Sequence, residues 1–263
     1  MSHRPGDLAR IEKALLLAGD ILNAYQPGRV EATRKANSDP VTEADLEVDR
    51  ALRQELVAPG EGWLSEETAD DPARLLCDRV WVVDPLDGTK EFVEGLPEWC
   101  VSIGLVENGE AVAGGVYNPA AGFLAVGSVG SGVLLNGNPA QCTKVANLNG
   151  ARVLASRSEV RRGEWDHWQD TEVKIEAMGS VAYKLARVAC GLADATWTLV
   201  PKHEWDVAAG VALVRAAGGW VTTVEGDPPL FNQPHPWLPG LIAANSTLAE
   251  GLDAASLSKS EGR

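Results

Sequence analysis

Short apolar segments separated by turn residues fill the stretch from Arg79 to Gly137, and this pattern constrains the fold most strongly. RVWVVDP, CVSIGLVENGE, AVAGGVYNP and FLAVGSVGSGVLLNG suit strands, and Gly, Pro and Asn-Gly pairs interrupt them. Asn-Gly favours two-residue turns between antiparallel strands, and it occurs at Asn108-Gly109 and Asn136-Gly137. We therefore expect an antiparallel meander here, not parallel strands joined by helices.

Helical patterns flank this strand region on both sides. Apolar residues recur at helical spacing between residues 7 and 25, and a second helix is expected after Thr42, which forms a capping-box pattern with Asp45. Further along, SVAYKLARVACGLADA and DVAAGVALVRAAGG predict helices, while residues 151–156, TWTLV, WVTTVE and GLIAAN predict strands. Separate blocks of strands and helices indicate an α/β (α+β) fold built in layers.

The length and composition suit one folded domain. The chain has 263 residues, 45% of them apolar and 23% charged, and no long linker divides it. We expect residues 1–263 to form a single two-lobed domain with a lobe boundary near residue 150. The four cysteines lie far apart without zinc or disulfide spacing, and no segment reaches the roughly 18 apolar residues of a membrane span. These features favour a cytoplasmic location.

The formal charge of −14 restricts the partners of the chain. No Lys/Arg-rich run offsets this charge, so we expect no binding to polymeric nucleic acid or to an anionic membrane. A small anionic substrate would also be repelled unless cations reverse the local potential of its site. The composition therefore points toward a bound metal.

The segment VVDPLDGTK places two carboxylates at the end of an apolar strand. Pro85 restricts Asp84, and Gly88 permits a tight turn, so Asp84 and Asp87 can converge on one point. Hard divalent cations such as Mg²⁺ take carboxylate and carbonyl oxygens, so the two carboxylates and the Leu86 carbonyl form a partial ligand set. The spacing alone leaves a turn with solvated carboxylates equally open.

Two further acidic residues lie at element boundaries. Glu66 follows a predicted strand in LSEE. Adjacent side chains of an extended chain point to opposite sides, so we expect only one of Glu66 and Glu67 to share the metal site, and we choose Glu66. Asp206 begins a predicted helix. An acidic loop for Glu66 and a helix cap for Asp206 are the alternatives. No His has a second His or Cys at zinc-ligand spacing, so His203 is expected in a loop or near the substrate.

Motifs of other hydrolytic mechanisms are absent from the sequence. It contains no G-x-S-x-G elbow, no C-x5-R pattern, no G-x-x-x-x-G-K-[ST] loop for nucleotide triphosphates and no G-x-G-x-x-G after a strand. Covalent and dinucleotide mechanisms are therefore disfavoured.

Five segments together resemble the inositol monophosphatase superfamily in content and order. They are NSDPVTEADLEVD (37–49), LSEE (64–67), VVDPLDGTKEF (83–92), GSVAYKL (179–185) and EWDVAAG (204–210). The resemblance implies a layered α/β/α/β/α sandwich shared with fructose-1,6-bisphosphatase, two or three Mg²⁺ ions, and direct attack of activated water without a phosphoenzyme.

The resemblance also implies roles for individual residues. The metal ligands would be Glu66, Asp84, the Leu86 carbonyl, Asp87 and Asp206. The catalytic residues would be Asp45, Glu66 and Thr89, with Asp45 orienting Thr89 or holding a water. The substrate-binding residues would be Asp87, Gly88, Thr89, Ser180, Lys184 and Asp206.

The substrate is harder to infer than the reaction. Superfamily members that act on inositol phosphate usually carry a Glu seven residues before the WD aspartate, and Leu199 stands there in this chain. LSEE, DPLDGTKEF and PLFNQPHPWLPGL look like the bacterial branch that removes the 3′-phosphate of 3′-phosphoadenosine 5′-phosphate. We expect that activity. The alternatives are an inositol-1-monophosphatase or broad sugar-phosphate phosphatase, and a binding protein that has lost catalysis. Lithium sensitivity and a homodimer also follow from the resemblance alone.

Overall fold

The computed structural model describes residues 4–34, 40–249, 251–252 and 257, so residues 37–39 of the first motif lie outside the described residues. The helices are α1 (Pro5–Leu22), α2 (Glu43–Leu56), α3 (Thr89–Glu94), α4 (Arg157–Arg161), α5 (Val181–Ala189), α6 (Glu204–Ala216) and α7 (Ser246–Ala249). The strands are β1 (Ala32–Arg34), β2 (Pro40–Thr42), β3 (Gly62–Ser65), β4 (Arg79–Asp87), β5 (Cys100–Glu107), β6 (Glu110–Asn118), β7 (Phe123–Ser128), β8 (Gly132–Leu135), β9 (Asn138–Ala140), β10 (Arg152–Ser156), β11 (Lys174–Met178), β12 (Ala195–Thr198), β13 (Lys202–His203), β14 (Gly219–Thr223), β15 (Trp237–Leu238) and β16 (Leu241–Asn245).

The strands from β3 to β9 form one sheet in sequence order. Strand β3 runs parallel to β4, and every later neighbour in this sheet is antiparallel. Both Asn-Gly pairs form the tight turns expected of them, with positive φ angles at Asn108, Gly109, Asn136 and Gly137. The predicted antiparallel meander is confirmed.

A second sheet has the order β11-β10-β12-β16-β14. Strand β10 is parallel to both β11 and β12, while β16 is antiparallel to β12 and β14. The remaining described strands form the short pairs β1-β2 and β13-β15.

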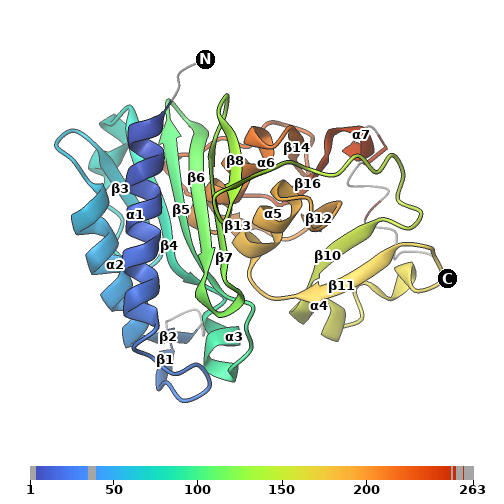
Figure 1. The fold of residues 1–263 in the computed structure, drawn as a ribbon, viewed down its shortest axis with the longest axis horizontal. Helices are drawn as coiled ribbons and strands as arrows, with labels where there is room; N and C mark the ends of the chain where they lie inside the picture. Colours follow the sequence, from blue (N-terminus) through green and yellow to red (C-terminus); the bar gives the residue numbers. More distant parts are fainter. Residues whose placement is uncertain (1–3, 35–39, 250, 253–256, 258–263) are drawn as a thin grey trace.

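Helices and sheets alternate in layers (Figure 1). Helices α1 and α2 pack on one face of the larger sheet, and α5 and α6 lie between the two sheets. Helices α4 and α7 contact the smaller sheet, whose outward-facing Val153, Ile242 and Ala244 share a core with Leu248 of α7. This α/β/α/β/α arrangement confirms the fold that the sequence predicts.

Glycines allow α6 to approach the larger sheet closely. A Cβ atom on Gly104 would lie 2.8 Å from Ala208 Cβ, and one on Gly114 would lie 2.7 Å from the Ala209 carbonyl oxygen. Since real Cβ atoms do not approach backbone that closely, the two glycines set the separation between β5, β6 and α6. This packing fixes the position of the helix that carries Asp206.

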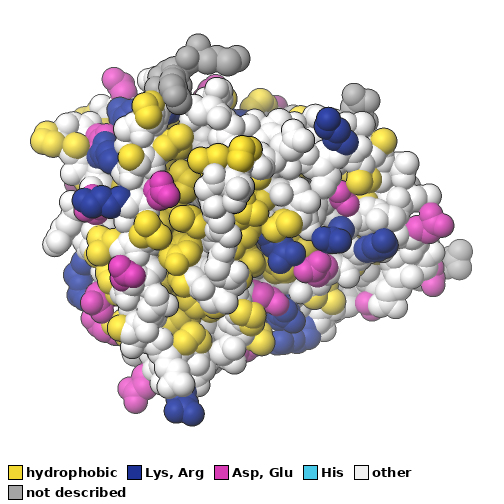
Figure 2. Space-filling view, in the orientation of Figure 1, with side chains coloured by type: hydrophobic (Ala, Val, Ile, Leu, Met, Phe, Trp, Pro, Cys, Tyr) yellow, Lys and Arg dark blue, Asp and Glu magenta, His cyan; other side chains and the backbone are white. Residues whose placement is uncertain are grey.

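The outer face of the larger sheet is only partly covered. Figure 2 shows hydrophobic side chains gathered beside α1, over the strands of this sheet. Leu16, Leu134 and Val129 are among the exposed apolar residues of the described chain. Among the described residues, no helix combines the length and apolar character needed to cross a bilayer.

Candidate functional site

Asp84 is buried on β4, at the point where this strand departs from regular pairing. The register between β4 and β5 shifts at this point, because Asp84 pairs with Ser102 and Asp87 pairs with Cys100. An advance of three residues along β4 therefore matches an advance of only two residues along β5. Residues three apart on a regular strand would face opposite sides, and one extra residue brings them to the same side. The bulge at Pro85-Leu86 therefore directs both aspartates toward the interior helices, and the Leu86 amide donates to Asp84 Oδ1 at 3.0 Å.

Glu66 lies next to Asp84 because of strand register. Strand β3 pairs in parallel with β4 up to Ser65 opposite Val83, so the following residues of the two strands are neighbours. Asp49 of α2 holds the Glu66 turn, since its carboxylate accepts hydrogen bonds from Ser65 Oγ and Thr68 Oγ1, each at 2.5 Å. Asp49 thereby positions Glu66, a role that the sequence did not reveal.

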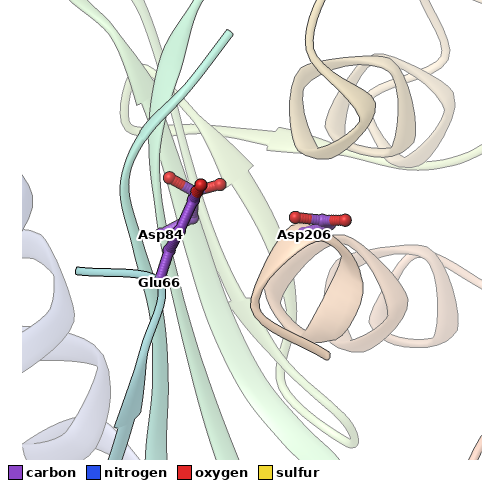
Figure 3. A group of neighbouring side chains, drawn as sticks. All are labelled: Glu66, Asp84 and Asp206. Carbon is purple, nitrogen blue, oxygen red and sulfur yellow. The ribbon is translucent and has the colours of Figure 1, made fainter. Parts of the chain in front are cut away.

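Asp206 faces the two sheet carboxylates from the first turn of α6 (Figure 3). It also caps this helix, because its Oδ2 accepts from the His203 backbone amide at 3.0 Å. The sequence presents a helix cap and a metal ligand as alternative roles for Asp206. The structure shows that one side chain can cap the helix and still face the other two carboxylates.

One oxygen from each of Glu66, Asp84 and Asp206 lies within 4.8 Å of the others. Burial and the neighbouring negative charges raise the pKa of Asp84 well above its usual value, and burial and Asp87 raise the pKa of Asp206 to about 8. Three carboxylates held this closely repel one another unless protons or a cation neutralise them. All donors are hard oxygens, so the set fits a divalent cation such as Mg²⁺.

Asp87 lies beside this group and connects it to α5. Its Oδ2 accepts from Ser180 Oγ at 2.6 Å and from the Ala182 amide at 2.7 Å. Burial raises the pKa of Asp87, although these hydrogen bonds oppose the shift. Ser180 adopts a φ angle of 55°, a conformation rare for a residue with a side chain, so local strain is concentrated at this junction.

Thr89 and Asp45 form a second polar pair, across the turn from Asp84. Thr89 Oγ1 lies 3.0 Å from Asp45 Oδ1 and 2.9 Å from the Leu86 carbonyl oxygen. The other oxygen of Asp45 accepts from the amide and hydroxyl of Thr42, which confirms the capping box at the start of α2. Gly88, with a φ angle of 96°, makes the turn that brings Thr89 back toward the strand end.

A cleft of about 200 Å³ opens beside these residues. Of the predicted substrate contacts, Asp87, Gly88, Ser180, Lys184 and Asp206 line it. Sequence reasoning missed several other lining residues, among them Lys90, Ser156, Arg157, Thr198 and Lys202. Arg157 could have been found, because it directly follows a predicted strand end, where sites are commonly built.

Lys184 and Leu199 occupy environments that their sequence positions did not reveal. Lys184 is buried, its ammonium lies 3.4 Å from the Met178 carbonyl oxygen, and desolvation lowers its pKa to about 8. Leu199 lines a separate pocket with Trp165 and Trp168, whereas its neighbour Thr198 lines the cleft. Of these two neighbours, Thr198 is therefore the one that lines the cleft.

His203 ends β13 and is the N-cap residue of α6, and its ring lies among aromatic side chains. The ring stacks on Trp205 with centroids 4.3 Å apart and lies 3.6 Å from the Trp237 ring. Neither His203 nor Trp205 belongs to the described lining of the cleft. A structural role at the start of α6 accounts for this contact.

The chain is similar to known proteins along nearly its whole length. A sequence model of the Inositol monophosphatase family matches residues 7–261. A Xylella fastidiosa protein named Nus factor SuhB is 34% identical over 263 aligned residues, covering 95% of this chain and 94% of that protein. An inositol-1-monophosphatase of Rhizobium meliloti is 34% identical, covering 75% of this chain and 77% of that protein.

A third relative bears on the substrate, and a solved structure bears on the fold. The relative is a 3′-phosphoadenosine 5′-phosphate phosphatase of Mycobacterium bovis, 34% identical over 78% of this chain and 77% of its own length. The crystal structure of the extragenic suppressor protein suhB from Bartonella henselae superposes with a TM-score of 0.81 at 28% identity, covering 96% of this chain and 98% of that chain.

Proposed function

Because the chain belongs to the inositol monophosphatase family, whose members are metal-dependent phosphatases, we propose that it hydrolyses 3′-phosphoadenosine 5′-phosphate at the 3′-phosphate with Mg²⁺. The phosphatase activity follows from the family. The nucleotide substrate and the identity of the metal are the proposal.

One observation carries the proposed chemistry: Glu66, Asp84 and Asp206 meet within 4.8 Å although they come from separate elements. A bound Mg²⁺ would lower the pKa of a water molecule and neutralise charge on the phosphate oxygens. Glu66, Asp84 and Asp206 would hold the cation, together with the Leu86 carbonyl and the free oxygen of Asp87. The binding of two or three ions remains our prediction.

The protein's own groups can position the attacking water. A hydroxyl has one proton, and donation to a carboxylate is stronger than donation to a neutral carbonyl, so Thr89 donates to Asp45. The Thr89 oxygen then keeps lone pairs that can accept a hydrogen bond from water. Asp45 thus positions Thr89, and Thr89 with Glu66 orients the water.

The lining of the cleft supports a substrate other than inositol phosphate. Relatives that act on inositol phosphate usually carry a Glu at the position of Leu199. In this chain Leu199 does not line the cleft and its neighbour Thr198 does, so neither residue offers a carboxylate to bind sugar hydroxyls. A relative of similar identity is named as a 3′-phosphoadenosine 5′-phosphate phosphatase. An inositol-1-monophosphatase or a broad phosphatase is the second candidate, because several relatives carry the inositol name.

The proposal includes the setting in which the protein acts. With a net charge of −14, we expect small phosphorylated substrates and no stable complex with polymeric nucleic acid or membranes. Cytoplasmic location, lithium sensitivity, a homodimer and a single two-lobed domain are part of the same proposal.

The direct test measures phosphate release from 3′-phosphoadenosine 5′-phosphate and from inositol-1-phosphate, with Mg²⁺ and with excess chelator. We expect the nucleotide to be preferred and the chelator to stop the reaction. Preference for inositol phosphate would overturn the proposed nucleotide substrate. Phosphate release that persists in excess chelator would overturn the proposed metal-dependent mechanism.

Removing one carboxylate at a time tests the site itself. Glu66→Gln, Asp84→Asn and Asp206→Asn should each lower kcat at least about a hundredfold while the circular dichroism spectrum stays unchanged. Asp170→Asn, at an exposed loop position, is the matched control and should keep wild-type kcat. Wild-type turnover in any of the three site variants would contradict the assignment.

A further inference from the structure

Four positively charged residues of the described chain line the cleft. Lys90, Arg157, Lys184 and Lys202 line it, although the chain carries only 23 Lys and Arg against 37 Asp and Glu. Two of the acidic lining residues, Asp87 and Asp206, belong to the carboxylate site, and Glu91 is the remaining one. Away from the carboxylates, the charge of the cleft is therefore opposite to that of the whole molecule.

The positions of Arg157 and Lys202 follow from their elements and neighbours. Arg157 starts α4 directly after β10, and its guanidinium pairs with both oxygens of Glu98. Lys202 lies on β13, four residues before Asp206. Desolvation and, to a smaller extent, the charge of Lys202 lower the pKa of the buried Lys184, whereas Asp87 opposes this shift, and Lys202 also counteracts the raised pKa of Asp206. Lys202 therefore places a positive charge in the cleft near both Lys184 and Asp206.

A buried hydroxyl in the same cleft also lacks a partner among the described residues. Thr198 is 5% exposed, and its Oγ1 has no hydrogen-bond partner among the described residues. An unsatisfied buried hydroxyl is costly, so such groups mark places where a ligand or water completes the bonding. A phosphate oxygen accepts hydrogen bonds from a hydroxyl, a guanidinium and an ammonium alike.

We propose that Lys202, Arg157 and Thr198, which line the same cleft as Asp87 and Asp206, form a subsite for a second phosphate group carried by the substrate. The subsite rests on the proposed function, because it presumes that the scissile phosphate lies at the carboxylates. It names the substrate class as small bisphosphates and assigns the contact to residues that the sequence did not single out.

Matched substrate pairs test the subsite. The first pair is 3′-phosphoadenosine 5′-phosphate and adenosine 3′-monophosphate, which differ only in the second phosphate. The second pair is fructose 1,6-bisphosphate and fructose 1-phosphate. We expect the wild-type protein to prefer the bisphosphate in at least one pair, and Lys202→Gln to lower kcat/KM for that bisphosphate about tenfold to a hundredfold with little effect on its monophosphate partner.

Two more variants control for charge and folding. Lys202→Arg should recover most of the bisphosphate preference because it keeps a cation. Lys13→Gln should leave both substrates unaffected, because the Lys13 side chain is 70% exposed on α1, on the opposite face of the larger sheet. Thermal unfolding of each variant shows whether the fold is intact.

The outcomes separate the subsite from the proposed substrate. Bisphosphate preference in the sugar pair alone, lost in Lys202→Gln, would support the subsite and overturn the nucleotide proposal. No bisphosphate preference in either pair, or equal losses for both members of a pair, would overturn the subsite. A further outcome would be that inorganic sulfate stimulates monophosphate hydrolysis by the wild type but not by Lys202→Gln. This result would show that the subsite binds a free anion, and it would overturn the proposal that it binds a second phosphate of the substrate.

Discussion

Single side chains in this site serve structure and chemistry together. Asp206 caps α6 while it faces Asp84, and Asp45 closes the capping box of α2 while it accepts the Thr89 hydroxyl. Asp87 anchors the start of α5. Because each carboxylate is held by backbone amides, its position is fixed before any ligand binds, and preorganised ligands lose little freedom on binding.

Thr89 offers a clean test of positioning at the scale of one residue. Thr89→Val keeps the shape of the side chain but removes the hydroxyl, so we expect kcat to fall about a hundredfold or more with only a small change in Tm. Thr89→Ser keeps the hydroxyl and should retain most of the activity. Steady-state kinetics with thermal unfolding checks both variants, and wild-type kcat in Thr89→Val would remove Thr89 from the mechanism.

At the scale of elements, the site depends on how closely α6 approaches the larger sheet. Gly114→Ala would place a Cβ 2.7 Å from the Ala209 carbonyl oxygen, so α6 must shift and carry Asp206 with it. We expect a loss of about 1–3 kcal/mol in the free energy of unfolding, together with weaker Mg²⁺ binding. Urea unfolding and Mg²⁺ titration measure the two effects.

The control for this prediction is Gly6→Ala in α1. A Cβ on Gly6 would meet nothing within 4 Å, so this variant should be as stable as the wild type or slightly more stable, because Ala favours helices. If Gly114→Ala also kept both wild-type stability and wild-type Mg²⁺ affinity, close packing of α6 would not control the site.

At the scale of the whole molecule, the clustered carboxylates make stability depend on pH and metal. The pKa of Asp206 is about 8 in the folded chain, against an ordinary value of 3.8. The folded state therefore keeps a proton that the unfolded chain releases, and this contribution is complete below pH 3.8 and is lost as the pH rises through about 8. The raised pKa of Asp84 acts in the same direction.

We accordingly expect the chelated protein to have a lower Tm at pH 8 than at pH 5.5, and Mg²⁺ to restore more of the Tm at pH 8. Asp206→Asn should flatten this pH dependence, because the amide does not titrate. Scanning calorimetry in chelator and in Mg²⁺ measures these values. A chelated protein that is equally stable at both pH values would show that the cluster does not control stability.

Most of the elements could be predicted from the sequence because their signals are local. The Asn-Gly turns, the Thr42–Asp45 capping box and the strand that ends at DPLDGT each depend on a few neighbouring residues. Strand alternation also indicated that only one of Glu66 and Glu67 would share the site but could not decide which, and in the structure Glu66 is the one that lies with Asp84 and Asp206.

The sequence by itself determined which residue types stand at element ends, and the resemblance of their order to a known family set the expected fold. Only the tertiary structure decided which side chains meet. Asp84 and Asp206 lie more than a hundred residues apart in the sequence. They face each other because the bulge in β4 directs Asp84 toward the interior and because glycines of the larger sheet allow α6, which carries Asp206, to approach closely. Arg157 follows a predicted strand end, but Thr198 and Lys202 carry no local signal for a cleft shared with it, because the three residues come to line one cleft only when the second sheet packs against α5 and α6.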